Sequence, residues 1–268
     1  MRTTRIAAVI CNARVGETEK NLGRMAGFIE KAAAEKASVI CFPEMSVTGY
    51  HVREDIIRVS EPIPGPATDF LAGLARRHHI TILAGLAEKG PDNQIFATHA
   101  VITRKGISGI YRKTHLGPSE KELFTPGDAI PLFTCHGITF GIQLCYDAHF
   151  PELATAMAIG GADVIFIPHA SPRTTPEAKM QSWMRHLTAR AYDNSLFVVA
   201  VNPCGQNGHG LSFPGVGVVL NPAGEIITAY TGTKEHLLIA DLKAGDLKTV
   251  RSHKMRYFLP NRRPEIYG

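Results

Sequence analysis

The 268-residue sequence predicts an α/β protein in which helices cover β-sheets. Short apolar runs rich in β-branched residues alternate along the chain with longer segments of helical periodicity. Two hairpin signals also look alike, VITRKGI at 101–107 and VVLNPAGEI at 218–226. Because each comes near the end of its half of the pattern, we expect two related halves within a single domain spanning residues 1–268.

The first half of the chain is predicted to supply two helices and five strands. Runs such as IAAVIC (6–11) and VICF (39–42) read as buried strands, whereas residues 20–36 place apolar side chains at helical spacing. Pro66 is favourable near the start of a helix, and Arg104-Lys105-Gly106 is a hairpin signal. In chain order we expect a strand at 6–11, a helix at 20–36, a strand at 39–42, a helix at 66–78, a strand at 80–85, and hairpin strands at 95–103 and 107–111.

The second half repeats this alternation. Phe150-Pro151-Glu152 opens a short alanine-rich helix that ends at Gly160-Gly161. Asn221-Pro222-Ala223-Gly224 provides the turn of the second hairpin, and the basic, proline-containing tail at 251–268 is expected to run along a surface. The other expected elements are a helix at 176–192 and strands at 138–144, 164–167, 196–201, 216–220, 225–230 and 237–241.

Composition excludes several classes of protein. Hydrophobic residues make up 44% and charged residues 20% of the chain, which is ordinary for a folded protein and unlike a disordered or collagen-like one. The formal net charge of +5 is scattered along the sequence, so we expect no nucleic-acid partner. No apolar run approaches the roughly 18 residues of a membrane span, and the first residues lack the apolar core of a signal peptide. We therefore expect a cytoplasmic protein that does not bind membranes.

The cysteines support a reducing compartment. There are five of them, an odd number, and no two form a C-x-x-C pair, which argues against a disulfide framework or a zinc knuckle. The twelve histidines include no H-E-x-x-H motif, so we expect no metal site. Motifs of the forms G-x-S-x-G, G-x-G-x-x-G and G-x-x-x-x-G-K-[ST] are also absent. Their absence argues against a lipase-like serine elbow, a dinucleotide site and a phosphate-binding loop.

Three polar residues follow predicted strands. Glu44 comes just after 39–42, Lys113 just after 107–111, and Cys145 directly after 138–144. In α/β folds, ligands and catalytic groups collect at the carboxyl ends of strands. We expect Cys145 to lie at a strand-to-helix elbow, where helix amides and the Lys113 ammonium favour a nucleophilic thiolate. The alternative is an unreactive buried cysteine, and spacing alone weighs the two interpretations equally.

Glu44 and Lys113 each have a structural interpretation beside the catalytic one. Glu44 could be a general base for the thiol and later an acid for a leaving amine, or it could cap a turn. Lys113 could donate to a developing oxyanion, or it could be a solvated lysine. Taken singly, the structural interpretation is favoured for both residues.

Three motifs occur in a fixed order along the chain: FPE with TGY at 42–50, YRKTHL at 111–116, and CYDAHFPE at 145–152. Three further segments accompany them, RAYDN at 190–194, VAVN at 199–202 and NRRPEIY at 261–267. Together they resemble the nitrilase superfamily, the carbon–nitrogen hydrolases. The resemblance covers nearly the whole chain, and three catalytic motifs in the correct order make a chance match very improbable.

The resemblance implies a four-layer αββα sandwich with Glu44, Lys113 and Cys145 as the catalytic triad. A second glutamate is usual in the family six residues before the proline of a P-G-D turn. Here that position is Glu120, which we prefer to its neighbour Glu122. The resemblance implies no cofactor, and it implies a homodimer or a larger homo-oligomer.

The reaction implied is hydrolysis of a non-peptide C–N bond in a small aliphatic amide, ω-amide or N-carbamoyl compound, through a thioester. The backbone N–H of Tyr146 would join the oxyanion hole, and Tyr50, His169 and Arg173 would bind substrate. Arg173 could clamp a substrate carboxylate, or it could be an exposed loop residue. Without Arg173 in the pocket, an aliphatic amide or an N-carbamoyl amine is the better prediction.

Two alternatives to amide hydrolysis stay open. A nitrile substrate is disfavoured because nitrilases of the family tend to carry longer C-terminal extensions. A non-catalytic binding or regulatory relative is disfavoured because all four residues of the implied catalytic set are present.

Overall fold

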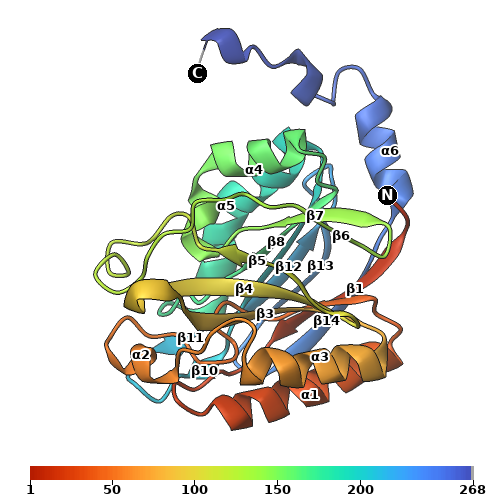
Figure 1. The fold of residues 1–268 in the computed structure, drawn as a ribbon. Coiled ribbons are helices and arrows are strands. Elements are labelled where there is room, and N and C mark those ends of the chain that lie inside the picture. Colours follow the sequence, from red (N-terminus) through yellow and green to blue (C-terminus); the bar gives the residue numbers. More distant parts are fainter. Residues whose placement is uncertain (267–268) are drawn as a thin grey trace.

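Two six-stranded β-sheets lie face to face, and each is covered on its outer side by a pair of helices (Figure 1). The structure, a computed structural model, describes residues 1–266, so Tyr267 of the C-terminal motif lies outside the described residues. The first sheet is covered by α1 (Thr18–Ala34) and α3 (Pro66–His78), and the second by α4 (Pro151–Ile159) and α5 (Pro176–Asn194). The predicted four-layer αββα sandwich is therefore confirmed.

The two sheets repeat one strand pattern. In each, three parallel strands are flanked on one side by an antiparallel hairpin and on the other by an antiparallel edge strand. The first sheet has the order β14 (His236–Leu242), β1 (Thr4–Ile10), β2 (Val39–Cys41), β3 (Thr81–Lys89), β4 (Ile95–Thr103), β5 (Gly106–Arg112). The second has the order β13 (Ile226–Gly232), β12 (Gly215–Leu220), β9 (Phe197–Asn202), β8 (Val164–Pro168), β7 (Ile138–Ile142), β6 (Phe133–Cys135).

Strand β1 shows how the core is divided between the layers. Successive side chains of a strand point to opposite faces of its sheet. Ile6, Ala8 and Ile10 belong to the apolar cluster shared with the second sheet, and Ala7 and Val9 to the cluster under α1 and α3. Both faces of β1 are thus buried, which explains why its sequence is a continuous apolar run.

Most predicted elements are confirmed to within a few residues, and α3 has the predicted bounds. Strand β3 is longer than predicted and runs to Lys89, because Leu86 and Ala87 continue its pairing with β4. The elements that were not predicted are short. They are β6, α2 (Asp55–Val59), β10 (Gly205–Gln206), β11 (Ser212–Phe213), α6 (Ala244–Ser252) and the 3-10 turns at 91–93, 145–149, 259–261 and 264–266.

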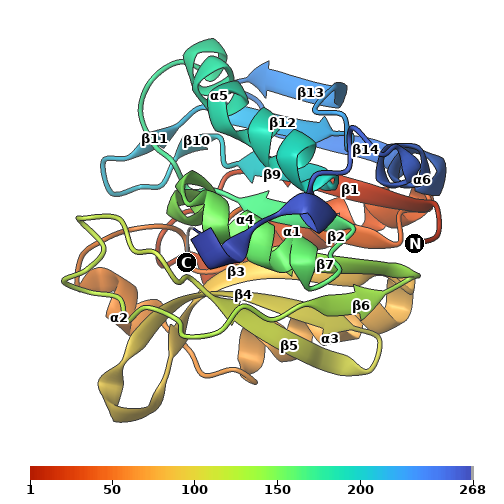
Figure 2. The same ribbon diagram turned by 90° about the horizontal axis from the view of Figure 1, so that it is seen from above.

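The C-terminal segment lies outside the four layers. After α6 the chain extends past α4 (Figure 1), and most residues of 253–266 are exposed. Figure 2 gives the view from above, with α4 and α5 lying over the second sheet. Within residues 1–266, no helix has the length and apolar character needed to cross a membrane.

Candidate active site

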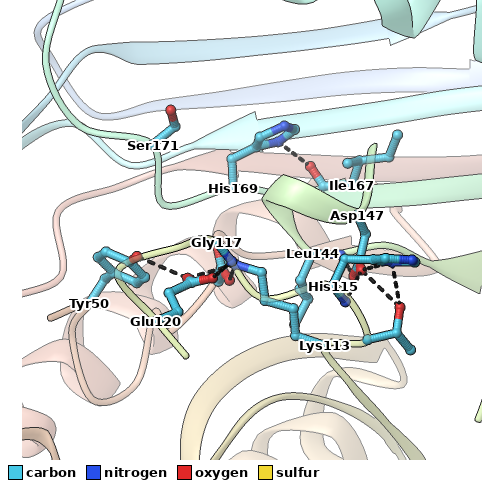
Figure 3. Close-up of polar contacts among 12 residues, drawn as sticks. Tyr50, Lys113, His115, Gly117, Glu120, Leu144, Asp147, Ile167, His169 and Ser171 are labelled. Atoms are coloured by element: carbon cyan, nitrogen blue, oxygen red, sulfur yellow. Dashed lines mark hydrogen bonds and ion pairs between the residues drawn. The ribbon is translucent and has the colours of Figure 1, made fainter. Parts of the chain in front are cut away.

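Three of the predicted residues form one buried ionic cluster. The Lys113 ammonium donates to Glu44 Oε1 at 2.9 Å and to Glu120 Oε1 at 2.7 Å. All three side chains are almost completely excluded from solvent. Figure 3 shows Lys113 and Glu120 directed toward each other, with Tyr50 on the far side of Glu120. Glu122 is exposed, so Glu120 rather than its neighbour belongs to the cluster.

Close backbone packing fixes Glu44. It follows β2, and its N–H donates to the carbonyl of His169, which follows β8 in the other sheet, at 3.2 Å. The Glu44 segment crosses β3 at Gly85, where a Cβ atom would lie 2.4 Å from the Met45 nitrogen. A side chain at position 85 would therefore push the carboxylate away from Lys113.

Lys113 and Glu120 are held by main-chain hydrogen bonds. The Lys113 N–H donates to the Ala97 carbonyl at 2.9 Å, just past the end of β5. Glu120 lies in a turn in which the Gly117 N–H donates to Glu120 Oε2 at 2.6 Å. The Glu120 N–H returns a bond to the Gly117 carbonyl at 2.9 Å. These bonds orient both side chains before any substrate is bound.

Cys145 begins the 3-10 turn that follows β7, and its backbone is left-handed with φ = 45°. Burial raises the pKa of its thiol to about 12. The charges of Glu44 and Glu120 add to this shift, while Lys113 and the Ala170 N–H oppose it. Burial and two carboxylates thus act against the expected thiolate, and one ammonium acts in its favour. The regular helix begins only at Pro151, after the 3-10 turn that Cys145 opens.

Burial also raises the pKa of Glu44 to about 7, with the Lys113 charge opposing the shift and the Glu120 charge adding to it. Burial acts to lower the pKa of Lys113, but the charges of Glu44, Cys145 and Glu120 outweigh it, so the net shift is well upward. Lys113 is thus charged while two carboxylates share it. One carboxyl can therefore take up and release a proton near neutral pH.

Two of the three predicted substrate-binding residues lie near the cluster. The Tyr50 hydroxyl donates to Glu120 Oε1 at 2.9 Å. His169 is buried, its Nδ1 donates to the Ile167 carbonyl at 2.8 Å (Figure 3), and its ring lies against Trp183 with the centroids 4.2 Å apart. Because burial holds the pKa of His169 well below its usual value, the ring is neutral and Nε2 is an acceptor.

Arg173 is not brought to the cluster. It is exposed on a left-handed backbone with φ = 67°, and its N–H donates to the Ser212 carbonyl at 2.9 Å. Lys179 of α5 is the cation that sequence reasoning missed. Its ammonium donates to Ser171 Oγ at 2.6 Å, and burial lowers its pKa while the charge of an ionised Cys145 acts to raise it. Lys179 lies about three turns of α5 before the RAYDN segment at 190–194, so no motif marks it in the sequence.

Asp147 is the second residue that sequence reasoning left without a role. Its buried carboxylate accepts from the Tyr111 hydroxyl at 2.7 Å and from the Leu144 N–H at 2.9 Å. It also accepts from the His115 N–H at 2.8 Å and the Thr114 hydroxyl at 2.9 Å (Figure 3). One carboxylate therefore ties the Cys145 turn to the loop that begins at Lys113. The sequence could have indicated this role, because Asp147 is part of the CYDAHFPE motif.

Comparisons of the sequence and of the structure with known proteins agree on one family. Residues 5–252 match the carbon-nitrogen hydrolase family. The chain is 31% identical over 267 residues to a protein named nitrilase from Pyrococcus abyssi, covering 98% of both chains. It is 30% identical to an (R)-stereoselective amidase from Pseudomonas sp, covering 92% of this chain and 88% of that one.

A solved structure of the amidase from Nesterenkonia sp. AN1 in complex with acrylamide superposes with a TM-score of 0.85 at 28% identity. The alignment covers 99% of this chain and 96% of that chain. Another structure of the same amidase shows covalent addition of the acetamide moiety of fluoroacetamide at its active-site cysteine. The family match and these relatives span almost the whole sequence, and the chain belongs to the carbon-nitrogen hydrolase family.

Proposed function

We propose that the protein hydrolyses the C–N bond of a small aliphatic amide through a thioester on Cys145. The main support for this proposal is that the two oxygens of the Glu44 carboxylate have different surroundings. Its Oε1 is bound by Lys113, whereas Oε2 is buried without a hydrogen-bond partner among residues 1–266. Buried acceptors are rarely left unpaired. The Glu44 charge acts on the Cys145 thiol, and an unpaired oxygen on that carboxylate supports a role as the base that receives the thiol proton.

Acylation then needs no preformed thiolate. As Sγ of Cys145 bonds to the amide carbon, its proton passes to Glu44 and the carbonyl electrons move onto oxygen. The Lys113 ammonium and the N–H of Tyr146 stabilise that oxyanion, and each such donor contributes about 2.7–4 kcal/mol. The C–N bond breaks as protonated Glu44 gives its proton to the leaving nitrogen. The products of this half-reaction are ammonia or an amine and the thioester.

Deacylation uses the same carboxylate in reverse. Water attacks the thioester carbon while Glu44 accepts a proton from it, and Glu120 assists through their shared ammonium. The C–S bond breaks, the sulfur regains the proton from Glu44, and the carboxylic acid leaves. A group with pKa about 7 suits both directions of transfer, since neither form is strongly favoured at neutral pH. The family match over 5–252 supports one catalytic domain.

A second candidate substrate class is an amide that also carries a carboxylate, such as an ω-amide or an N-carbamoyl amino acid. The observation that favours it is Lys179, which is partly buried near Cys145. Among residues 1–266, Lys179 has no carboxylate within ion-pair distance, and a neutral hydroxyl is its hydrogen-bond partner. A substrate carboxylate would supply the missing countercharge. Exposed Arg173 does not support this role.

The proposal is tested by ammonia release from a panel of aliphatic amides, ω-amides, N-carbamoyl amines, N-carbamoyl amino acids and nitriles. Intact mass spectrometry of the quenched reaction should show an acyl adduct on the wild-type chain and none on Cys145→Ala. Turnover of nitriles alone would favour the nitrilase alternative. Substrate binding without ammonia or adduct from any compound would favour a non-catalytic relative.

Lys179→Met separates the two substrate classes, because methionine keeps the length of the side chain but removes its charge. For an ω-amide we expect kcat/KM to fall at least about tenfold, the effect of losing one charge-assisted hydrogen bond. For a neutral amide of the same chain length it should hold within about twofold. Equal effects on both would reject the carboxylate role of Lys179 without affecting the proposal for Cys145.

A further inference from the structure

A second cluster of ionisable side chains lies beside Tyr50, outside the catalytic cluster. His51, Asp55 and His209 each offer one ligand atom, and these three atoms lie within 4.8 Å of one another. Asp55 is the first residue of α2 and His51 lies in the segment just before that helix, while His209 comes from the loop between β10 and β11. Sequence spacing predicted no metal site, and it could not reveal this cluster because its members converge from opposite halves of the chain.

Both imidazoles point the same nitrogen at one carboxylate. His51 Nδ1 lies 2.8 Å and 2.9 Å from the two oxygens of Asp55, and His209 Nδ1 lies 2.7 Å from Asp55 Oδ2. Each Nδ1 carries a proton in its hydrogen bond to Asp55, in the direction that its lone pair takes when the proton is lost. A cation that displaces these protons would therefore meet two nitrogens and an oxygen already directed at it.

Metal binding requires a modest rearrangement of the ligand atoms. Tetrahedral zinc at the usual bond length of about 2.0–2.1 Å separates its ligand atoms by about 3.3 Å. Each nitrogen–oxygen contact would thus open by about half an ångström, and the two imidazole nitrogens already lie within 4.8 Å of each other. Side-chain rotation of His209 can supply this movement, because its side chain is 39% exposed, whereas that of His51 is only 5% exposed. His51 is therefore held in place, whereas the side of the cluster at His209 is open to an entering ion and to water as a further ligand.

The donor set selects the class of ion. Two imidazole nitrogens and one carboxylate suit divalent transition metals such as zinc, cobalt, nickel or copper. Magnesium and calcium prefer sites built wholly from oxygen.

We propose that His51, Asp55 and His209 bind one divalent transition-metal ion, with zinc as the representative ion. The bound ion would clamp together the two segments that hold Tyr50. The Asn207 amide already donates to the Tyr50 carbonyl at 2.9 Å, and Asn207 Oδ1 accepts from the His209 N–H at 2.9 Å. Because the Tyr50 hydroxyl donates to Glu120, the ion would stabilise one edge of the catalytic cluster without touching its reacting atoms.

The test measures zinc binding to the full chain after treatment with a chelator. Isothermal titration should show one zinc ion per chain and no comparable uptake of magnesium. At a free zinc concentration about a hundred times Kd, the melting temperature should rise by about 5 °C. Cobalt provides a spectroscopic probe, because its visible absorption changes in intensity when imidazole and carboxylate replace water around it.

Two variants locate the ion, and two controls check its specificity. Asp55→Asn and His209→Asn should each weaken zinc binding at least tenfold, and His209→Asn alters a partly exposed side chain that the fold does not depend on. His253→Asn, at an exposed histidine elsewhere, should bind zinc like the wild type. Cys145→Ala should retain the stoichiometric site, which excludes the buried thiol as the ligand.

Two results would overturn the proposal. One is the absence of stoichiometric zinc and cobalt binding by the wild-type chain. The other is unchanged zinc affinity in both Asp55→Asn and His209→Asn. In either case His51, Asp55 and His209 would be only a hydrogen-bonded group. Binding is measured without substrate, so these outcomes do not depend on whether the protein is an amidase.

Discussion

The two sheets share one strand pattern, but their strand ends carry different chemistry. β2 and β8 occupy equivalent places, yet the first is followed by Glu44 and the second by His169. The hairpin strand β5 leads to Lys113, whereas its counterpart β13 turns back toward the first sheet to form β14. Conversely, β7 leads to Cys145. The scaffold is repeated, and the charges and the sulfur come from opposite halves.

This difference explains why Asp147 matters. The first half can be built without a nucleophile and the second without a buried cation, because each sheet has its own apolar faces. The proposed mechanism requires the two to be held together at fixed spacing. Asp147 follows β7 and accepts hydrogen bonds from Tyr111, Thr114 and His115, which belong to the other half. Its side chain therefore links the two halves at the site, beside the main-chain bond from Glu44 to His169.

Removal of the Cys145 sulfur tests what the second half of the chain contributes, and it should have the largest effect on activity. Cys145→Ala should lower kcat at least about 10⁴-fold, as removal of a nucleophile does in other covalent hydrolases. The measurement is ammonia release together with the mass of any trapped acyl adduct. Cys135→Ala alters a cysteine at the edge strand β6 and should leave kcat within about twofold. Near-normal turnover by Cys145→Ala would reject the proposal that the second half of the chain supplies the nucleophile.

Removal of the base tests the first half. Glu44→Gln keeps the shape of the side chain but removes proton transfer, so kcat should fall about 10²–10⁴-fold. In the proposed mechanism the ionised carboxylate is the base, so wild-type kcat/KM should decline as pH falls through about 7, the pKa to which burial raises Glu44. The variant should lack that limb of the profile. An unchanged limb would assign it to another group, and exposed Glu122→Gln should behave as the wild type.

Asp147→Asn tests the link between the halves. The amide places an N–H₂ group where only acceptors fit, against donors from Tyr111, Leu144 or His115. We expect the free energy of unfolding to fall by about 3 kcal/mol, since hydrogen bonds to a buried charge contribute about 1.5–3 kcal/mol each. Chemical denaturation measures this loss. Asp69→Asn, on the exposed surface of α3, should change stability by less than about 0.5 kcal/mol.

Tyr50→Phe should have the smallest effect. It removes one hydrogen bond to Glu120 but keeps the ring packed against Phe213. The loss of about 1.5 kcal/mol corresponds to roughly a tenfold fall in kcat/KM. Exposed Tyr192→Phe is the matched control and should be neutral. If Tyr50→Phe is also neutral, Glu120 is held sufficiently by Lys113 and Gly117 alone.

The sequence predicts the scaffold well because periodicity is a local property. The continuous apolar run of β1 and the proline that opens α3 are both visible without any distant contact. Two- and three-residue strands such as β10 and β6 have too few residues to show a period. The helix α6 lies outside the core layers and lacks a strong apolar face, so it was missed as well.

The site was predicted unevenly for a related reason. Glu44, Lys113 and Cys145 follow strands and lie in motifs, so their positions could be read from the chain. The pKa of Cys145 depends on its burial and on charges contributed by distant segments, which the sequence alone does not show. Arg173 and Lys179 are both basic residues after β8, and only the fold distinguishes the exposed one from the one near the sulfur.

The left-handed backbone of Cys145 opposes stability. At φ = 45° a residue with a Cβ atom costs roughly 1–2 kcal/mol, and the turn is kept in place by the surrounding hydrogen bonds. A chain under selection for stability alone would relax this residue or replace it with glycine. Directed evolution toward heat resistance without an activity screen should therefore accumulate changes at position 145. The gain in the free energy of unfolding from such changes would measure how much stability the conformation of Cys145 costs the protein.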